Sequence, residues 1–238
     1  MKQFYIRLLR LIWGLFLYAL GIVFTLNAHI GYAPWEVFHV GFAKTAGISI
    51  GNASIITGVV IGIIVLLLGE KLGLGTVLNM VLIGMFLDLI LRLDIIPVAN
   101  HFVWGIIMLV AGLFIIALAS YFYIGSAFGA GPRDSLMIAL TRKTKLPIGV
   151  CRGMIELLAV FVGWRLGGML GIGTIISAFL IGFCVQTTFK LLKFDSTAIK
   201  HETLDRTFKM FFKYEKMQAD EEDVPEIKFN SPDNQSAE

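Results

Sequence analysis

Long apolar segments separated by short polar ones dominate the first 190 or so residues of the chain. A helix that crosses a bilayer needs about 20 predominantly apolar residues. Six segments approach this length with few charges, and the second contains no ionisable residue at all. We therefore predict an all-α polytopic membrane protein with six transmembrane helices. The predicted spans are Leu8–Ile30, Ile50–Gly69, Thr76–Leu93, Pro97–Ile124, Ile148–Leu166 and Thr174–Leu192.

The apolar pattern repeats itself after 98 residues. GYAPWEVFHVGFAK at Gly31 aligns with GAGPRDSLMIALTR at Gly129, and LGEKLGLGT at Leu68 aligns with LGGMLGIGT at Leu166. Residues 14–93 match residues 112–191 without a gap, and 20 of the 80 aligned positions are identical. Such self-similarity indicates an internal structural repeat.

Each repeat contains three predicted spans, and an odd number of spans gives successive repeats opposite orientations in the membrane. The two halves are therefore expected to be inverted three-helix repeats related by a pseudo-twofold axis in the membrane plane. Many secondary transporters are built in this way. We predict a transmembrane domain over residues 1–194 and a cytoplasmic tail over residues 195–238, amphipathic at first and then disordered.

The charges change sign along the chain and suggest its orientation. Residues 1–193 carry 14 Lys/Arg and 6 Asp/Glu, whereas residues 194–238 carry 6 and 11. Cytoplasmic loops of membrane proteins are enriched in Lys and Arg. Placing the N-terminus in the cytoplasm leaves only Lys44, Arg92 and Arg165 on the outer side among the cations of the first 193 residues, so both termini are predicted to be cytoplasmic.

A short segment opened by proline lies between the first and second span of each repeat, at Pro34–Ala46 and at Pro132–Lys145. Proline is favourable at the first position of a helix, and Glu36 and Asp134 follow where a carboxylate meets the positive end of the helix dipole. Both segments are too short to cross a bilayer. They either lie on the membrane surface or enter it as re-entrant half-helices, which are tolerated only where they are buried or line a cavity.

Ionisable residues inside predicted spans are rare and suggest function. Arg152 and Glu156 are four residues apart, so they share a helix face and are expected to pair. Asp88 lies in the third span. Many of the Ser, Thr and Asn side chains in the spans, such as Thr57 and Ser177, are expected to form hydrogen bonds between helices. The duplicated Gly-x-Gly-Thr elements at Gly73 and Gly171 predict tight turns in which threonine caps the following helix.

Several classes of protein are disfavoured. The mean hydropathy of +0.80 and a charged fraction of only 16% argue against a soluble nucleic-acid-binding protein. No His, Cys and carboxylate spacing indicates a metal site, and no nucleophile, zinc-protease or phosphate-binding motif is present. We therefore expect no enzyme activity, no cofactor and no metal.

The motifs resemble those of the YczE/YyaS/YitT family of bacterial integral membrane proteins, over roughly residues 10–195. The Arg152 and Glu156 positions also fit this resemblance, which implies a protein of the bacterial plasma membrane and supplies no biochemical activity. The residues that carry it are Ala33–Glu36, Ile50-Gly51, Gly73–Thr76, Gly129–Asp134, Gly167-Gly168 and Gly171–Thr174.

Two functions remain open from the sequence. The first is a transporter or channel for a small polar or anionic solute. The second is a membrane-embedded scaffold or regulator that acts on a cytoplasmic partner, such as a biosynthetic enzyme complex, through the acidic tail. The candidate solute-binding or gating residues are Pro34, Trp35, Glu36, Asp88, Pro132, Arg133, Asp134, Arg152 and Glu156.

Overall fold

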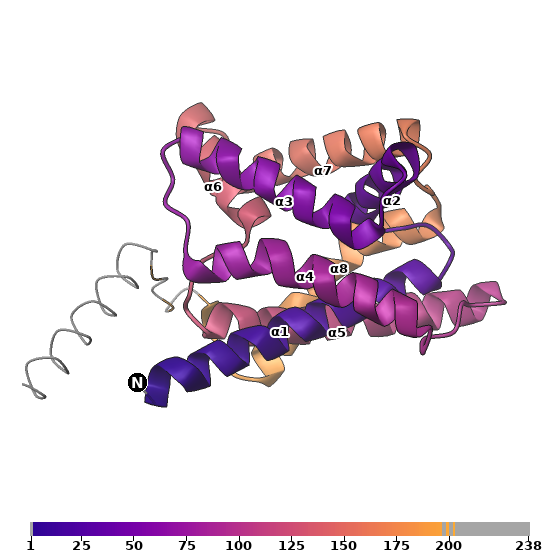
Figure 1. Cartoon of the computed structure of the whole chain (residues 1–238), viewed down its shortest axis with the longest axis horizontal. Coiled ribbons are helices and arrows are strands. Elements are labelled where there is room, and N and C mark those ends of the chain that lie inside the picture. The colour runs from indigo at the N-terminus through magenta and orange to yellow at the C-terminus, as the bar shows by residue number, and fades with distance from the viewer. Residues whose placement is uncertain (1, 197–198, 200–201, 203–238) are drawn as a thin grey trace, which may run out of the picture. The chain divides into compact units, whose positions relative to one another are not determined.

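The structure, a computed structural model, describes residues 2–196, 199 and 202. These residues form eight α-helices and no β-strand (Figure 1). In chain order the helices are α1 (Lys2–Asn27), α2 (Pro34–Ala46), α3 (Ile50–Leu67), α4 (Leu74–Leu93), α5 (Phe102–Gly125), α6 (Pro132–Thr144), α7 (Ile148–Arg165) and α8 (Ile172–Leu191). The predicted amphipathic segment and disordered tail lie outside the described residues.

Five of the helices are long and apolar enough to cross a membrane, namely α1, α3, α4, α5 and α8. The chain is thus an all-α, multi-pass membrane protein. Six spans were predicted, and α7, which corresponds to the predicted span Ile148–Leu166, is not among these five. Its 18 residues are as many as those of α3, but they include Arg152, Glu156 and Arg165, which give α7 more charge than an ordinary span carries.

The long helices α1 and α5 form the centre of the bundle and pack against each other in antiparallel fashion. A Cβ atom added to Gly21 would lie 2.8 Å from the carbonyl oxygen of Gly112, and one added to Gly14 would lie 3.2 Å from that of Ala119. These glycines let the two backbones approach closely. Helix α4 packs on α1, and α8 packs on α5.

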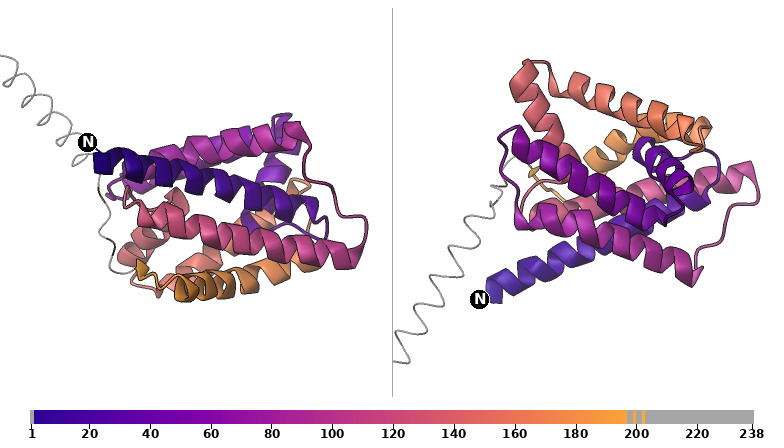
Figure 2. Two further views of the ribbon diagram at one scale, coloured as in Figure 1. Left: turned by 90° about the horizontal axis from the view of Figure 1, so that it is seen from below. Right: turned by 45° about the horizontal axis from the view of Figure 1, so that its top comes forward.

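The remaining four helices form a second layer over this centre (Figure 1). Helix α2 packs on α7 and α6 packs on α3, so each short helix contacts a long helix of the other half of the sequence. Gly41 of α2 and Gly163 of α7 are in close backbone contact. The two short helices lie toward opposite ends of the bundle, as Figures 1 and 2 both show.

The Gly-x-Gly-Thr elements form the predicted turns. Thr76 and Thr174 accept hydrogen bonds from the backbone N–H groups of Gly73 and Gly171 at 3.1 and 3.3 Å, which caps α4 and α8. Each turn also joins the opposite part of the chain. The N–H of Gly75 donates to the carbonyl of Phe128, and that of Gly173 donates to the carbonyl of Ile30, both at 2.8 Å.

Left-handed backbone conformations recur at the same spacing of 98 residues. They occur at His29 and Ala127, Gly31 and Gly129, Gly47 and Lys145, and Gly69 and Gly167. Within each pair the two φ angles differ by no more than about 8°. The similarity of the two halves therefore extends from sequence to local backbone geometry.

Candidate functional site

The first turns of α2 and α6 are built alike. The residues before the two prolines, Ala33 and Gly131, have nearly the same extended backbone, with φ and ψ of −63° and 158° for Ala33 and −61° and 157° for Gly131. In neither helix does the residue before proline supply a side chain that caps the free N–H groups. Each first turn instead carries an acidic side chain, Glu36 in α2 and Asp134 in α6, near the positive end of the helix dipole.

The second residues of the two helices contact each other. The guanidinium carbon of Arg133 lies 4.5 Å from the ring centroid of Trp35, a cation–π distance. One guanidinium nitrogen of Arg133 also lies 3.4 Å from Nε2 of His39 in α2. Arg133 thus joins the first turn of α6 to the first two turns of α2.

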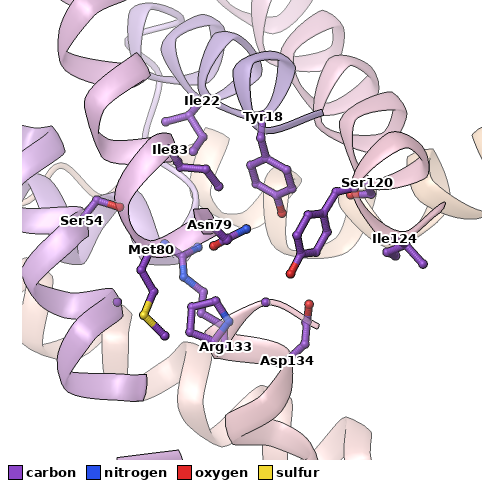
Figure 3. Close-up of a pocket in the computed structure, with 14 residues that line it drawn as sticks. Tyr18, Ile22, Ser54, Asn79, Met80, Ile83, Ser120, Ile124, Arg133 and Asp134 are labelled. Carbon is purple, nitrogen blue, oxygen red and sulfur yellow. The ribbon is translucent and has the colours of Figure 1, made fainter. Parts of the chain in front are cut away.

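A polar cavity of about 100 Å³ lies on the α6 side of this contact. It is lined by the first turn of α6 together with residues of α1, α3, α4 and α5. Figure 3 shows Tyr18, Asn79 and Asp134 facing a common space from three different helices. The hydroxyl of Tyr123, another lining residue, is buried and has no hydrogen-bond partner among the described residues. A buried polar atom of this kind usually binds a water molecule or a ligand.

A second cavity, also about 100 Å³, lies on the α2 side. Residues 33–36 line it, just as their counterparts 131–134, 98 positions later, line the first cavity. Tyr18 and Arg133 line both of these cavities as well as a third space of similar size between them. The three spaces are therefore adjacent and share the Arg133 side chain as a wall.

Helix α7 contributes an ion pair to the α2-side cavity. Arg152 donates from Nε to Oε1 of Glu156 at 2.8 Å, as the i, i+4 spacing predicted. The corresponding positions of α3, Ser54 and Gly58, line the α6-side cavity and carry no charge. The α2-side cavity is therefore the more highly charged of the two.

Burial shifts the pKa values of two groups in α2, which is not one of the five candidate spans. Glu36 is only 7% exposed. Burial raises the pKa of its carboxyl, and the nearby Arg133 acts in the opposite direction. The pKa of His39 lies well below 6.5 because of burial and, secondarily, because of Arg133. His39 is accordingly a neutral ring beside the guanidinium at pH 7.

Asp88 lies elsewhere. Its carboxylate accepts hydrogen bonds from the hydroxyl of Ser49 at 2.5 Å and from the backbone N–H of Gly51 at 2.8 Å. These groups belong to the N-terminal turn of α3, so Asp88 caps α3 from the neighbouring helix α4. It lines none of the three central cavities.

The other eight predicted residues all line the central cavities: Pro34, Trp35, Glu36, Pro132, Arg133, Asp134, Arg152 and Glu156. Sequence reasoning missed Tyr18 and Tyr123, since tyrosines inside apolar segments look like ordinary span residues. It also did not single out His39, although the i, i+4 spacing from Trp35 could have placed both on one face of α2.

No group of three or more His, Cys, Asp or Glu side chains is arranged to hold a metal ion within the described part of the chain. Cys151 and Cys184 are both buried and unpaired. The residues that line the three cavities supply hydrogen-bonding groups and charges of both signs.

Comparisons with known proteins place these features in a family. Residues 5–190 match a family described as a family of unknown function (DUF6198). The chain is 35% identical over 175 residues to the "Uncharacterized membrane protein YczE" of Bacillus subtilis (strain 168). The aligned residues cover 73% of this chain and 80% of that protein. An "Uncharacterized protein" of Haemophilus influenzae is 32% identical over 157 residues, with coverage of 66% and 71%.

A third relative, the "Uncharacterized protein YyaS" of Bacillus subtilis (strain 168), is 26% identical over 185 residues, which is 76% of this chain and 90% of that protein. The resemblance inferred from the motifs is thus confirmed for YczE and YyaS. No solved structure matches the chain significantly.

Proposed function

This chain belongs to the DUF6198 family, and we propose that it is a small-solute transporter or channel of the bacterial plasma membrane. Its pathway runs from the α6-side cavity to the α2-side cavity, past Trp35 and Arg133. The solute is small, and it is polar or anionic. The proposal assigns the protein no enzymatic reaction.

The observation that carries the proposal is the meeting of two short helices at a polar centre. Trp35 and Arg133 are in contact at the N-termini of α2 and α6, and both lie beside Tyr18, one turn past the midpoint of α1. Irregular backbone and short helices at membrane depth occur where they are buried or line a water-filled cavity. We therefore interpret α2 and α6 as re-entrant half-helices whose N-termini face the permeant.

The size and polarity of the cavities support this interpretation. A water molecule takes up roughly 30 Å³ of liquid volume, so about 100 Å³ accommodates a few waters or one small solute. The unpartnered hydroxyl of Tyr123 supplies a hydrogen-bonding group for either. Arg133, between the cavities, supplies a positive charge that favours an anion over a cation.

The proposal includes six spans arranged as two inverted three-helix repeats, with α7 as the sixth span. Its support is the recurrence of left-handed residues every 98 positions and the reciprocal bonds of Gly75 with Phe128 and of Gly173 with Ile30. The ion pair of Arg152 with Glu156 offsets part of the charge on α7.

We further propose that both termini are cytoplasmic. Cations gather at the end of the bundle that holds the start of α1 and the end of α6. There Arg7 donates to the carbonyl of Ser126 at 2.9 Å, and Arg142 pairs with Glu70 at 3.0 Å. At the opposite end Lys44 donates to the carbonyl of Gly167 at 3.1 Å. The first end carries more basic residues, which favours the cytoplasmic side.

Flux measurements on purified protein in liposomes test the proposal. Light scattering after an osmotic step would compare urea and glycerol with formate, acetate and nitrate as potassium salts, in the presence of valinomycin. We expect flux of at least one of these solutes, and a loss of about tenfold or more in Arg133→Ala. Glu156→Gln distinguishes proton-coupled transport from simple conduction. If Glu156 carries a coupled proton, the effect of a pH gradient on flux differs between the variant and the unmodified chain. If transport is simple conduction, the effect of the gradient is the same in both.

The matched control is Arg92→Ala, which removes an exposed arginine of α4 that lines none of the cavities. Its flux is expected to equal that of the unmodified chain. Equal flux in the unmodified chain, in Arg133→Ala and in Glu156→Gln would remove the assigned residues. A rate no faster than that of empty liposomes for every solute would contradict transport of this solute class.

The alternative is a scaffold or regulator that acts through the acidic tail on a cytoplasmic partner. Residues 205–238 lie outside the described part of the chain, so this role stays a prediction. Deleting residues 205–238 distinguishes the two functions. A transporter keeps its flux after the deletion, whereas a regulator loses its cellular effect even though the membrane domain remains folded.

A further inference from the structure

An apolar groove of about 540 Å³ shares Trp35 with two of the polar spaces. It is bounded by the two short helices α2 and α6 and by the long helices α3 and α7 that they pack on. Phe38 and Phe42 line it from α2, and Leu136 and Leu140 line it from α6. Its volume is about five times that of either polar cavity.

The groove presents almost no polar surface. Thr57 is its one hydroxyl-bearing lining residue, and that hydroxyl donates to the carbonyl of Ala53 in the preceding turn of α3 at 2.7 Å. Val60 and Leu158, on the two long helices, are 50% and 63% exposed. In a membrane protein such side chains are covered by hydrocarbon, so an acyl chain suits this lining.

Basic residues lie at the α6 end of the groove. Leu136, Leu140 and Lys143 follow the i, i+4, i+7 spacing of one helix face, and the exposed Lys145 comes just after α6 ends. Arg142 is already engaged by Glu70, whereas the two lysines extend the positive charge beyond the last leucine of the groove. A basic cluster beside an apolar surface attracts anionic lipid headgroups.

Trp35 connects this groove to the polar centre. It lines the groove, the α2-side cavity and the space between the cavities, and the guanidinium of Arg133 lies over its ring. A chain that fills the groove therefore contacts the tryptophan and limits its movement away from Arg133.

We propose that the groove binds one acyl chain of an anionic phospholipid, with the phosphate at Lys143 and Lys145 and the chain packed against Trp35. Bound lipid then holds Trp35 on Arg133 and keeps the groove separate from the polar cavities. This inference does not depend on transport, since it concerns the outer face of α2, α3, α6 and α7.

Fluorescence quenching by brominated lipids tests the site directly. Replacing Trp13, Trp104 and Trp164 by phenylalanine leaves Trp35 as the only tryptophan of the chain. In nanodiscs, phosphatidylglycerol with dibrominated acyl chains is expected to reach half-maximal quenching of Trp35 at a several-fold lower mole fraction than dibrominated phosphatidylcholine. Lys143→Ala with Lys145→Ala is expected to abolish that difference.

A matched pair of substitutions locates the acyl chain. Val60→Phe fills the groove and is expected to weaken quenching by both lipids, whereas Val59→Phe, on the same helix but outside the groove, is not. Equal half-maximal mole fractions for the two lipids, or unchanged quenching in Val60→Phe, would overturn the proposal.

A second measurement uses the chain with all four of its tryptophans in place. After extensive washing in detergent, the phospholipid retained by the full chain is expected to be enriched in phosphatidylglycerol. The enrichment is expected to disappear in the double lysine variant. Retention of phosphatidylcholine and phosphatidylglycerol in the proportions of the source membrane would contradict a specific site.

Discussion

Trp35 and Arg133 are the second residues of two short helices, 98 positions apart, and the guanidinium carbon of one lies 4.5 Å from the ring centroid of the other. Positions that correspond in the two halves of the sequence thus meet in space. An aromatic ring and a cation form a stable contact there, whereas two arginines would repel each other. The difference between the two halves at this position therefore allows the corresponding side chains to attract each other.

This contact predicts a measurable coupling. Trp35→Ala and Arg133→Ala should each destabilise the protein, and the double variant should be less destabilised than the sum of the two. A cation–π pair at a partly buried site contributes about 1 kcal/mol, so the coupling free energy should be of that size. Unfolding by SDS in mixed micelles measures it, and strictly additive effects would mean that the two side chains act independently.

Asp88 is predicted to stabilise the fold, in contrast to the solute-binding or gating role suggested by its place in a span. Asp88→Asn weakens the bonds to Ser49 and Gly51, and a charged hydrogen-bonding group of this kind contributes about 1–3 kcal/mol. The midpoint of SDS unfolding should fall accordingly. Asp94→Asn, at an exposed position past the end of α4, serves as the control and should leave the midpoint unchanged.

Flux separates the two interpretations of Asp88. Per folded molecule, solute flux in Asp88→Asn should equal that of the unmodified chain, because Asp88 lines none of the central cavities. A folded Asp88→Asn protein with altered solute selectivity would contradict the capping role.

Gly31 is predicted to tolerate no side chain. Its φ is +117°, and a Cβ atom there would lie 2.7 Å from the backbone of Gly171. Gly31→Ala should therefore cost about 1–3 kcal/mol or prevent folding. Gly182→Ala is the matched control, since a Cβ atom there meets nothing within 4 Å, and alanine favours helix. Thermal denaturation in detergent compares the two, and equal melting temperatures would refute the close contact.

His39 predicts a dependence of stability on pH. Because its pKa in the folded protein lies below its ordinary value of 6.5, the unfolded chain binds more protons in the window below 6.5. Its contribution to stability is therefore present above pH 6.5 and is lost as the pH falls through that window. His39→Gln should flatten the corresponding part of the curve of unfolding free energy against pH, measured between pH 5 and 8.

The control for this prediction is His101→Gln, which alters an exposed histidine at the start of α5. It should leave the curve as it is. A curve that is unchanged in His39→Gln would mean that the ring is not held neutral by its surroundings.

Local signals in the sequence were sufficient to predict the bounds of the two short helices to within one residue. Proline at the first position and an acid at the third predicted Pro34–Ala46 as observed, and the second helix, predicted as Pro132–Lys145, ends one residue earlier at Thr144. The pairing of Arg152 with Glu156 was equally predictable, because a four-residue spacing on a helix determines it.

Contacts between distant segments could not be derived in this way. The cap that Asp88 provides joins residues 37 and 39 positions apart and has no local signature. The hydroxyls of Thr57 and Ser177 were candidates for bonds between helices, yet each donates to a carbonyl four residues earlier in its own helix. Apolar surroundings make any nearby acceptor attractive, and the nearest one is often in the same helix.

The reciprocal bonds of the glycine turns have a consequence for biosynthesis. The N–H of Gly75 leaves the ribosome 53 residues before its acceptor, the carbonyl of Phe128, has been made. Until Phe128 has been synthesised, the N–H of Gly75 therefore lacks its hydrogen-bond partner. We expect the two halves to mature together as one folding unit, and a chain that stops after α4 to be recognised as incomplete by the quality-control proteases of the cell.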